Sequence, residues 1–374
     1  MTNTVGKTVL FCVLIASSSS CVIKSEVAQQ DSSPGFSIDG PLSWSQISSM
    51  NEARMEHTMT RLQDGRVLIT GGFGIGPITN ALDSVEIWDP ATQSFSFAKP
   101  MHTRRARHAA TLRSNGRVFV TGGYDSTIET AKAEEYDPET GEWTELAAMT
   151  VGRMYNAAVE LPDGNVLVAS GCCDQAYPTA EVYDFNVATF SATSPLEIAH
   201  AAPTLTVLPN GQVLIVGNSN LASTGLYNDS LQQWTSAGNL NTPRNEHTAT
   251  LLSSGHVVVA GGISKIPPTN SVESYDPSQK QWTLGASLRV ARRAHTASHL
   301  VANGLEDIVW VGGLNNTVLS SCERSLPQPC ANLNVARALH RAVVVDVNGQ
   351  TRILVTGGQG TDNQPTNSAE LSTF

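Results

Sequence analysis

A short pattern of apolar and polar segments recurs along most of the chain. Each copy contains an apolar run rich in β-branched residues that ends at a glycine pair or a variant of one, as in residues 67–70 before Gly71-Gly72. An Asp-Gly, Asn-Gly or Ser-Gly pair precedes most of these runs, as at Asp64-Gly65. Because such pairs adopt the positive φ angles of a tight hairpin turn, each copy predicts two antiparallel strands joined by that turn.

Each copy except the seventh continues beyond the glycines with two further predicted strands. A variable loop leads to a strand that ends in an acidic and aromatic cluster, such as residues 86–90 (EIWDP), and then to a strand centred on an aromatic residue such as Trp143. The copies follow one another at intervals of 44 to 51 residues. Four short strands in each such period predict the blade of a β-propeller. The seven copies place their glycine positions at Gly71, Gly122, Ser170, Gly217, Gly261, Gly312 and Gly357.

These features resemble the kelch repeat, which combines paired glycines, a Tyr-Asp-Pro turn, a later Trp and an Arg that opens the next copy. The resemblance covers residues 42–374 and implies an all-β fold, a seven-bladed kelch-type β-propeller with four antiparallel strands per blade. The seventh copy carries only its first three strands, whereas Trp44 and its neighbours form a spare fourth strand near the N-terminus. We therefore expect the N-terminal strand to close the ring, which would pair edges that are otherwise exposed.

The first 41 residues predict export. Lys7 precedes an apolar run at residues 8–16 that is too short to span a bilayer but suits a signal peptide. Small residues before Cys21 resemble a bacterial lipobox, so we expect a lipoprotein-type signal over residues 1–20 and lipidation of Cys21; ordinary secretion is the alternative. Residues 21–41 are polar and predict a flexible tether. The expected location is the periplasm, outer membrane or cell surface.

Four cysteines remain after this segment, and an even number in an exported chain favours disulfides. Cys322 and Cys330 flank a predicted turn in the sixth repeat and predict a disulfide there. Cys172 and Cys173 are adjacent, and we interpret them as a vicinal disulfide. The alternative is a soft-metal site that these two thiols form with His200. No other cofactor is predicted.

Composition narrows the range of partners. The chain has 374 residues, 40% of them hydrophobic and 15% charged, with a formal net charge of −10 at pH 7. This acidic balance makes nucleic acid and anionic membrane surfaces poor partners, apart from a lipid anchor. The expected partner is a glycan or a protein, and the expected state is a monomer.

An Arg followed three residues later by a His opens five of the seven repeats, as at Arg54 and His57. Such rings of side chains could bind an anion or a metal, but residues that repeat in every copy are usually scaffold. Copies with the Arg also have a Glu two residues before the aromatic position, as at Glu86; the fourth copy has neither, and the sixth has Arg292 with Ser320. This covariation favours a structural Arg–Glu pair inside each blade.

Departures from the repeat are the better candidates for function. The variable loops all lie on one face of a propeller, where binding and catalysis concentrate. Aromatic, carboxylate and amide side chains in repeats 2 to 4 suit a sugar, while plain sequence drift is the alternative interpretation of the fourth repeat. The candidate ligand-binding residues are Tyr124, Asp125, Tyr155, Cys172, Cys173, Asp174, Tyr177 and Asn218, and the candidate acid–base residues are Asp174 and His200.

The sequence contains none of the common catalytic motifs of hydrolases, nucleotide-binding proteins or zinc peptidases. Galactose oxidase and bacterial sialic acid epimerases are kelch propellers, but their resemblance is confined to the fold, and the Tyr and His pairs of the oxidase's copper site have no counterpart here. We therefore expect a module that binds a glycan or protein through its loop face. The alternatives are an epimerase-like or oxidase-like enzyme acting on a carbohydrate or small exported metabolite over blades 2 to 4, and an assembly scaffold.

Overall fold

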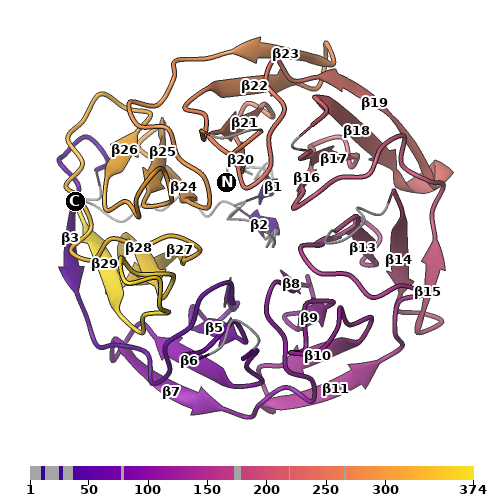
Figure 1. Ribbon diagram of the computed structural model, residues 1–374, viewed down its shortest axis with the longest axis horizontal. Coiled ribbons are helices and arrows are strands. Elements are labelled where there is room, and N and C mark those ends of the chain that lie inside the picture. The colour runs from indigo at the N-terminus through magenta and orange to yellow at the C-terminus, as the bar shows by residue number, and fades with distance from the viewer. Residues whose placement is uncertain are drawn as a thin grey trace, which may run out of the picture.

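The computed structural model describes residues 37–76, 80–171, 178–218, 220–264 and 267–374, and the backbone of a two-stranded sheet formed by β1 (Leu10–Cys12) and β2 (Ser25–Val27). Seven sheets stand around a common centre (Figure 1). The innermost strand of each sheet contacts the innermost strands of both neighbouring sheets, so the circle is closed. The predicted seven-bladed β-propeller is confirmed.

Each of the first three blades is an antiparallel meander of four strands. Blade 1 consists of β4 (Thr58–Arg61), β5 (Val67–Thr70), β6 (Val85–Asp89) and β7 (Ser94–Ala98). Blade 2 consists of β8 (Ala109–Leu112), β9 (Val118–Thr121), β10 (Ala133–Asp137) and β11 (Glu142–Leu146). Blade 3 consists of β12 (Ala157–Glu160), β13 (Val166–Ala169), β14 (Ala180–Asp184) and β15 (Thr189–Ala192).

Blades 4 and 5 have the same arrangement, with a 3₁₀ turn, η1 (Asp229–Leu231), between the last two strands of blade 4. Blade 4 consists of β16 (Thr204–Val207), β17 (Val213–Val216), β18 (Ser223–Asn228) and β19 (Gln233–Asn239). Blade 5 consists of β20 (Thr248–Leu251), β21 (Val257–Ala260), β22 (Val272–Asp276) and β23 (Gln281–Leu284). The described residues include no helix long and apolar enough to cross a membrane.

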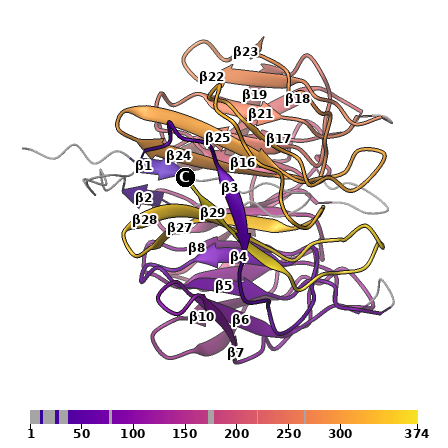
Figure 2. The same ribbon diagram turned by 90° about the vertical axis from the view of Figure 1, so that its left-hand side faces the viewer.

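The ring closes through the N-terminal strand, as the sequence predicts. Blade 7 consists of β27 (Arg341–Val347), β28 (Gln350–Thr356), β29 (Ala369–Thr373) and β3 (Ser43–Gln46). The outer strand β3 pairs antiparallel with the C-terminal strand β29, and the two lie side by side at the edge of the ring (Figure 2). Trp44 in β3 is buried and donates a hydrogen bond from Nε1 to the carbonyl oxygen of Ala331, which also anchors this strand to blade 6.

Blade 6 differs from the predicted four strands. It has only three, β24 (Thr296–Ala302), β25 (Leu305–Val311) and β26 (Cys322–Arg324). The predicted disulfide is present and joins Cys322 in β26 to Cys330 in the segment that follows, with the two Cα atoms 5.5 Å apart. Cys330 forms an isolated parallel bridge with Leu42, so this segment pairs with the chain leading into β3 rather than forming a regular fourth strand.

We expect the disulfide to stabilise blade 6 by restricting the unfolded chain. The two cysteines are separated by 8 positions, and closing a loop of this size is worth about 2–3 kcal/mol of unfolding free energy. Replacing both by serine should lower the urea midpoint accordingly. Adding reductant to the parent protein should reproduce most of this loss and should leave the double-serine variant unchanged. Equal midpoints for the two proteins would contradict this role.

The core follows from the burial pattern of the strands. The second strand of each blade lies between neighbouring blades and contains an apolar run, as in β9, where all four residues are buried. The fourth strand is at the periphery and is mostly exposed, as in β7. Its central aromatic residue packs inward, as Trp143 does on Tyr136 with ring centroids 5.0 Å apart. Apolar burial between blades is therefore what holds the ring together.

The connections sort onto two faces. The turn between the first two strands of a blade meets the turn between the last two strands of the next blade, as where Arg66 donates a hydrogen bond to the carbonyl oxygen of Pro138. The loops between the second and third strands, and between successive blades, lie at the opposite ends of the strands. We call that side the loop face, and it carries the candidate site.

Candidate functional site

An Arg–Glu pair lies beneath the loop face in six of the seven blades. In blade 5, Arg244 Nη2 is 2.7 Å from Glu273 Oε1, and both side chains are fully buried. The same guanidinium donates to the carbonyl oxygens of Gly261 and Ser271 and to the hydroxyl of Ser271. The predicted structural pairs are thus present, and they join Arg54–Glu86, Arg105–Glu134, Arg153–Glu181, Arg244–Glu273, Arg292–Glu323 and Arg337–Glu370.

The partner of Arg292 corrects the sequence interpretation. Counting back from the aromatic position places Ser320 opposite Arg292, but the structure places Glu323 there, 2.7 Å from the guanidinium. The count fails because β26 has only three residues, none of them aromatic. The aromatic residue from which the Glu position is counted in other blades is therefore absent. Blade 4 is then the only blade in which both members of the pair are replaced, by His200 and Gly225.

The repeated histidines are also scaffold. Each is buried and its Nε2 is hydrogen-bonded to a threonine hydroxyl of the preceding blade, at 3.0 to 3.2 Å. Each bond connects the segment that enters one blade to the first or second strand of the preceding blade, which agrees with the structural interpretation of the repeat. The pairs are His57–Thr356, His108–Thr58, His247–Thr204, His295–Thr248 and His340–Thr296.

The second residue after each repeated Arg, and after His200 in blade 4, has a left-handed backbone conformation, with φ between 45° and 58°. Because these residues sit just before the innermost strands, they form a circle at the loop face, which we call the inner ring. A non-glycine residue rarely adopts such a φ, and clusters of strained residues are typical of functional sites. The inner ring consists of Glu56, Arg107, Tyr155, Ala202, Glu246, Ala294 and Leu339.

Backbone hydrogen bonds connect the members of the inner ring. Arg107 N donates to Glu56 O at 3.1 Å and Tyr155 N donates to Arg107 O at 2.9 Å, and three further bonds continue the series through Leu339. Within the described residues, the series is interrupted only on both sides of Ala202. These bonds hold each strained backbone in place and fix the directions of the side chains that follow.

One substitution in blade 3 accompanies the interruption between Tyr155 and Ala202. In blades 1, 2, 5, 6 and 7 a glycine approaches the carbonyl of the next repeated Arg so closely that a Cβ would lie 2.2 to 2.5 Å from it, as at Gly71 and Arg105. Blade 3 has Ser170 at this position, and its hydroxyl accepts a hydrogen bond from the backbone N–H of His200 instead. The chain entering blade 4 is therefore attached differently from every other blade entry.

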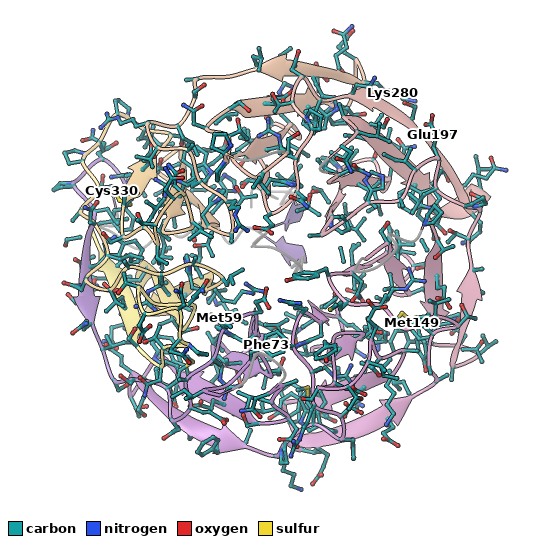
Figure 3. All side chains as sticks on the ribbon, viewed as in Figure 1. Met59, Phe73, Met149, Glu197, Lys280 and Cys330 are labelled. Atoms are coloured by element: carbon teal, nitrogen blue, oxygen red, sulfur yellow. A yellow bond between two sulfur atoms is a disulfide. The ribbon has the colours of Figure 1, made fainter. Side chains whose placement is uncertain are left out.

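Side chains of the inner ring form a charged and aromatic cluster over blades 1 to 3. Arg107 Nε is 2.5 Å from Glu56 Oε2, and the hydroxyl of Tyr155 donates to Glu56 Oε1 at 2.8 Å. The Arg107 guanidinium lies 4.5 Å from the ring centroid of Tyr155 and 5.1 Å from that of Phe73, which in turn packs against Tyr124 at 6.2 Å. Phe73 lies on the inner side of blade 1 (Figure 3).

Burial and charge perturb the titration of this cluster. Burial raises the pKa of Tyr155 well above its ordinary value, and the neighbouring Glu56 carboxylate raises it further. Burial lowers the pKa of Arg341 to about 10, although Glu56 and Tyr155 oppose the shift. At neutral pH the tyrosine is therefore protonated and the arginine is a cation, and both lie near the buried Glu56 carboxylate.

The structure distributes the predicted ligand-binding residues unevenly. Tyr155 lies in the cluster and Tyr124 contacts its edge through Phe73. Asp125 accepts hydrogen bonds from the backbone and hydroxyl of Thr127, so it holds its own loop, and Asn218 likewise bonds to residues of its loop and to Ala199. Cys172, Cys173, Asp174 and Tyr177 lie outside the described residues.

The sequence interpretation missed Glu56, Arg107 and Arg341. The signal for the first two was positional: each stands two residues after a repeated Arg, where residue type varies from blade to blade. Arg341 directly follows His340, and its burial beside Glu56 depends on a contact between blades 7 and 1 that no local pattern indicates.

The described part of the chain contains no group of three or more His, Cys, Asp or Glu residues that could hold a metal ion. His200 donates from Nδ1 to the carbonyl oxygen of Gly217 at 3.0 Å. Burial lowers the pKa of His200 to about 4, so the ring is neutral at pH 7 with an unprotonated Nε2. Its proposed thiol partners, Cys172 and Cys173, are outside the described residues.

Exposed apolar side chains lie in the loops of the same face. Ile75 is 67% exposed and Ile128 is 65% exposed, and both lie in the loops between the second and third strands of blades 1 and 2. Leu221 occupies the corresponding loop of blade 4 and is 49% exposed. A polar centre with exposed aliphatic residues around it provides both directional and apolar contacts to a partner.

Seven blades around a common centre, with variable loops on one face, define a seven-bladed β-propeller. The Kelch motif family matches residues 105–150 and 247–289, which begin with Arg105 and His247 and cover most of blades 2 and 5. With the repeated glycines and Arg–Glu pairs in the same register in the remaining blades, the chain is a kelch-repeat propeller.

Several known proteins share parts of this architecture. Kelch-like protein 36 from Bos taurus is 27% identical over 143 residues, which cover 38% of this chain and 22% of that protein. Kelch-like protein 23 from Homo sapiens is 27% identical over 217 residues, 56% of this chain and 38% of that protein. The matches thus span less than half the length of these relatives. A fungal alcohol oxidase of the AA5 family, solved with copper, superimposes with a TM-score of 0.72 over 88% of this chain and 76% of that chain at 18% identity, which establishes the common fold.

Proposed function

We propose that this propeller is a binding module whose loop face, centred on the inner-ring cluster of blades 1 to 3, holds a protein partner. The observation that carries the proposal is the cluster itself: charged and aromatic side chains fixed on a strained backbone ring, with Ile75 and Ile128 exposed beside them. Aromatic residues and arginine are the side chains that contribute most often to binding hot spots. The exposed isoleucines favour a protein surface over a sugar.

The second candidate partner is a glycan, since the aromatic rings of Tyr124 and Tyr155 lie beside hydrogen-bonding groups. Export and attachment to a bacterial surface through Cys21 would bring the loop face into contact with either kind of ligand. Selection of a displayed random-peptide library on the immobilised full-length protein, beside a glycan array, distinguishes the two candidates.

The selected ligand should lose affinity when the loop face is changed. We expect the variant Ile75→Ser/Ile128→Ser to bind at least about tenfold more weakly, because two buried aliphatic contacts are worth more than 1.4 kcal/mol together. The matched control is Val187→Ser/Leu231→Ser, which removes two similarly exposed aliphatic residues from turns on the opposite face. Calorimetric titration of the three proteins is the measurement. Weaker binding by the control alone would place the contact on the opposite face and overturn the proposal.

The enzyme alternative makes a different prediction for the same ligand. If the propeller acts on a carbohydrate or small exported metabolite, incubation should convert the ligand, and Asp174→Asn or His200→Gln should abolish conversion while preserving binding. A binding module should return the ligand unchanged. Chromatography of the ligand before and after prolonged incubation separates these two outcomes.

A further inference from the structure

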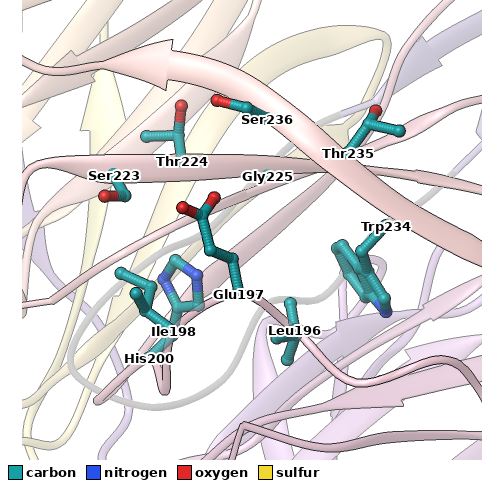
Figure 4. Close-up of a pocket in the computed structure, with 10 residues that line it drawn as sticks. All are labelled: Leu196, Glu197, Ile198, His200, Ser223, Thr224, Gly225, Trp234, Thr235 and Ser236. Atoms are coloured by element: carbon teal, nitrogen blue, oxygen red, sulfur yellow. The ribbon is translucent and has the colours of Figure 1, made fainter.

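Blade 4 contains a pocket where the other blades have an Arg–Glu pair. The pocket is about 70 Å³ in volume and is formed by the chain entering blade 4 and by strands β18 and β19 (Figure 4). His200 stands at the position of the repeated Arg and Gly225 at that of the Glu, so the loss of two large side chains creates the space. Its lining residues are Leu196, Glu197, Ile198, His200, Ser223, Thr224, Gly225, Trp234, Thr235 and Ser236.

The walls retain groups that hold a guanidinium in the other blades. In blade 5 the carbonyl and hydroxyl oxygens of Ser271 accept from Arg244, and serines at the same position do so in blades 1, 6 and 7. Blade 4 keeps this residue as Ser223, which lines the pocket. Within the described residues, the Ser223 hydroxyl has no hydrogen-bond partner. A hydroxyl that elsewhere binds a guanidinium is therefore available to a ligand.

The pocket also has its own carboxylate. Glu197 stands three residues before His200, where the other blades have Asn, His, Thr or Arg. Figure 4 shows its carboxylate directed over the pocket between His200 and Gly225. In blade 1 a carboxylate from the corresponding loop lies near the guanidinium of the repeated Arg. Glu52 Oε2 is 3.6 Å from Arg54 Nη2 and accepts a hydrogen bond from the hydroxyl of Ser84. In blade 4 the carboxylate is therefore on the loop, at Glu197, instead of on the third strand, and the arginine that it would pair with is absent.

The remaining walls suit a flat cation. His200 donates from Nδ1 to Gly217, so its neutral ring presents Nε2 as an acceptor. The indole of Trp234 lines the pocket, and its Nε1 is held by the hydroxyl of Thr193 at 3.2 Å. Guanidinium groups bind through planar sets of acceptors and stack on indole rings.

From this geometry we infer that the blade 4 pocket binds a guanidinium group, presented by an arginine side chain of a protein partner. The ligand's guanidinium takes the place of the missing arginine, with Glu197 and Ser223 as its acceptors. This inference goes beyond the binding surface at the inner ring and does not depend on it, because Glu197 lies at the outer edge of the ring (Figure 3), away from Phe73.

The test uses arginine with both ends blocked, N-acetyl-arginine amide, as the probe in calorimetric titration against the full-length protein. The matched probe is N-acetyl-citrulline amide, which has the same shape but no charge. We expect binding of the arginine probe, at least about tenfold weaker binding of the citrulline probe, and roughly three- to tenfold weaker binding of arginine to Glu197→Gln. An arginine-containing peptide should bind at least as well as the blocked residue if the natural source is a protein.

The variant His200→Arg/Gly225→Glu rebuilds the pair found in the other blades. It should abolish binding of the probe while raising the thermal midpoint, because the protein's own arginine then occupies the pocket. Should this variant not fold, Glu197→Gln and Ser223→Ala supply the same test. The variant Ile75→Ser/Ile128→Ser should bind the arginine probe normally. Equal binding of arginine and citrulline, binding of N-acetyl-glutamate amide instead, or no binding of the arginine probe would overturn the inference.

Discussion

Lowering the pH from 7 to 5 is expected to destabilise the propeller by on the order of 5–10 kcal/mol, more than any single substitution considered above. Five histidines are buried beside the innermost strands, and burial lowers the pKa of each, in His247 to about 3. Because their unfolded-state pKa is near 6.5, the unfolded chain takes up protons below that pH while the folded ring does not. Stability is thus full above pH 7 and falls as the pH drops through 6.5.

Urea unfolding at a series of pH values measures this effect. Each buried histidine adds about 1.4 kcal/mol per pH unit below pH 6, so replacing one of them, as in His108→Gln, should reduce the slope by about that amount. The control is Asn156→Gln, since the buried Asn156 stands in blade 3 where five other blades have the histidine, and an amide does not titrate. A pH-independent free energy of unfolding between pH 7 and 5 would show that these rings are not held neutral.

Removing one buried arginine should have the next largest effect. The variant Arg244→Met leaves the Glu273 carboxylate buried without its counter-ion, which typically costs about 3–5 kcal/mol. The double variant Arg244→Met/Glu273→Leu should lose less than the sum of the two single losses, because it removes the unpaired charge. Denaturant midpoints of the single and double variants give the coupling energy directly.

The matched control for this prediction is an exposed pair of the same chain. Lys99 and Glu142 form an ion pair in which both side chains are more than half exposed. The variant Lys99→Ala should therefore change the free energy of unfolding by less than about 1 kcal/mol. If Arg244→Met costs no more than Lys99→Ala, the Arg–Glu pairs are not the structural element proposed here.

Much of the fold was predictable because its determinants are local. Asp-Gly and Asn-Gly turns, apolar runs and glycine pairs each act within a few residues, and their repetition in one register indicates seven blades. Closure by Trp44 and the Cys322–Cys330 disulfide also followed from counting strands and cysteines. Blade 6 did not, because its three-residue β26 lacks the aromatic marker, which is why Glu323 was overlooked.

The site was less predictable because its determinants connect distant residues. Glu56 lies 51 residues before Arg107 and 99 before Tyr155 in sequence, and the three meet only through the inner ring. The pocket in blade 4 was visible in the sequence only as missing residues, His200 for Arg and Gly225 for Glu. From the sequence alone, these two replacements are equally consistent with sequence drift. Only the structure places Glu197 beside the pocket that they leave.

Partners are expected to bind the loop face through the inner-ring cluster. Amide hydrogen exchange of the full-length protein, with and without the peptide or glycan selected on it, tests this most directly. We predict slower exchange in residues 73–76 and 124–130 and around Tyr155 when the ligand is bound. Slower exchange confined to the turns around Val187 and Leu231, with none on the loop face, would contradict the account.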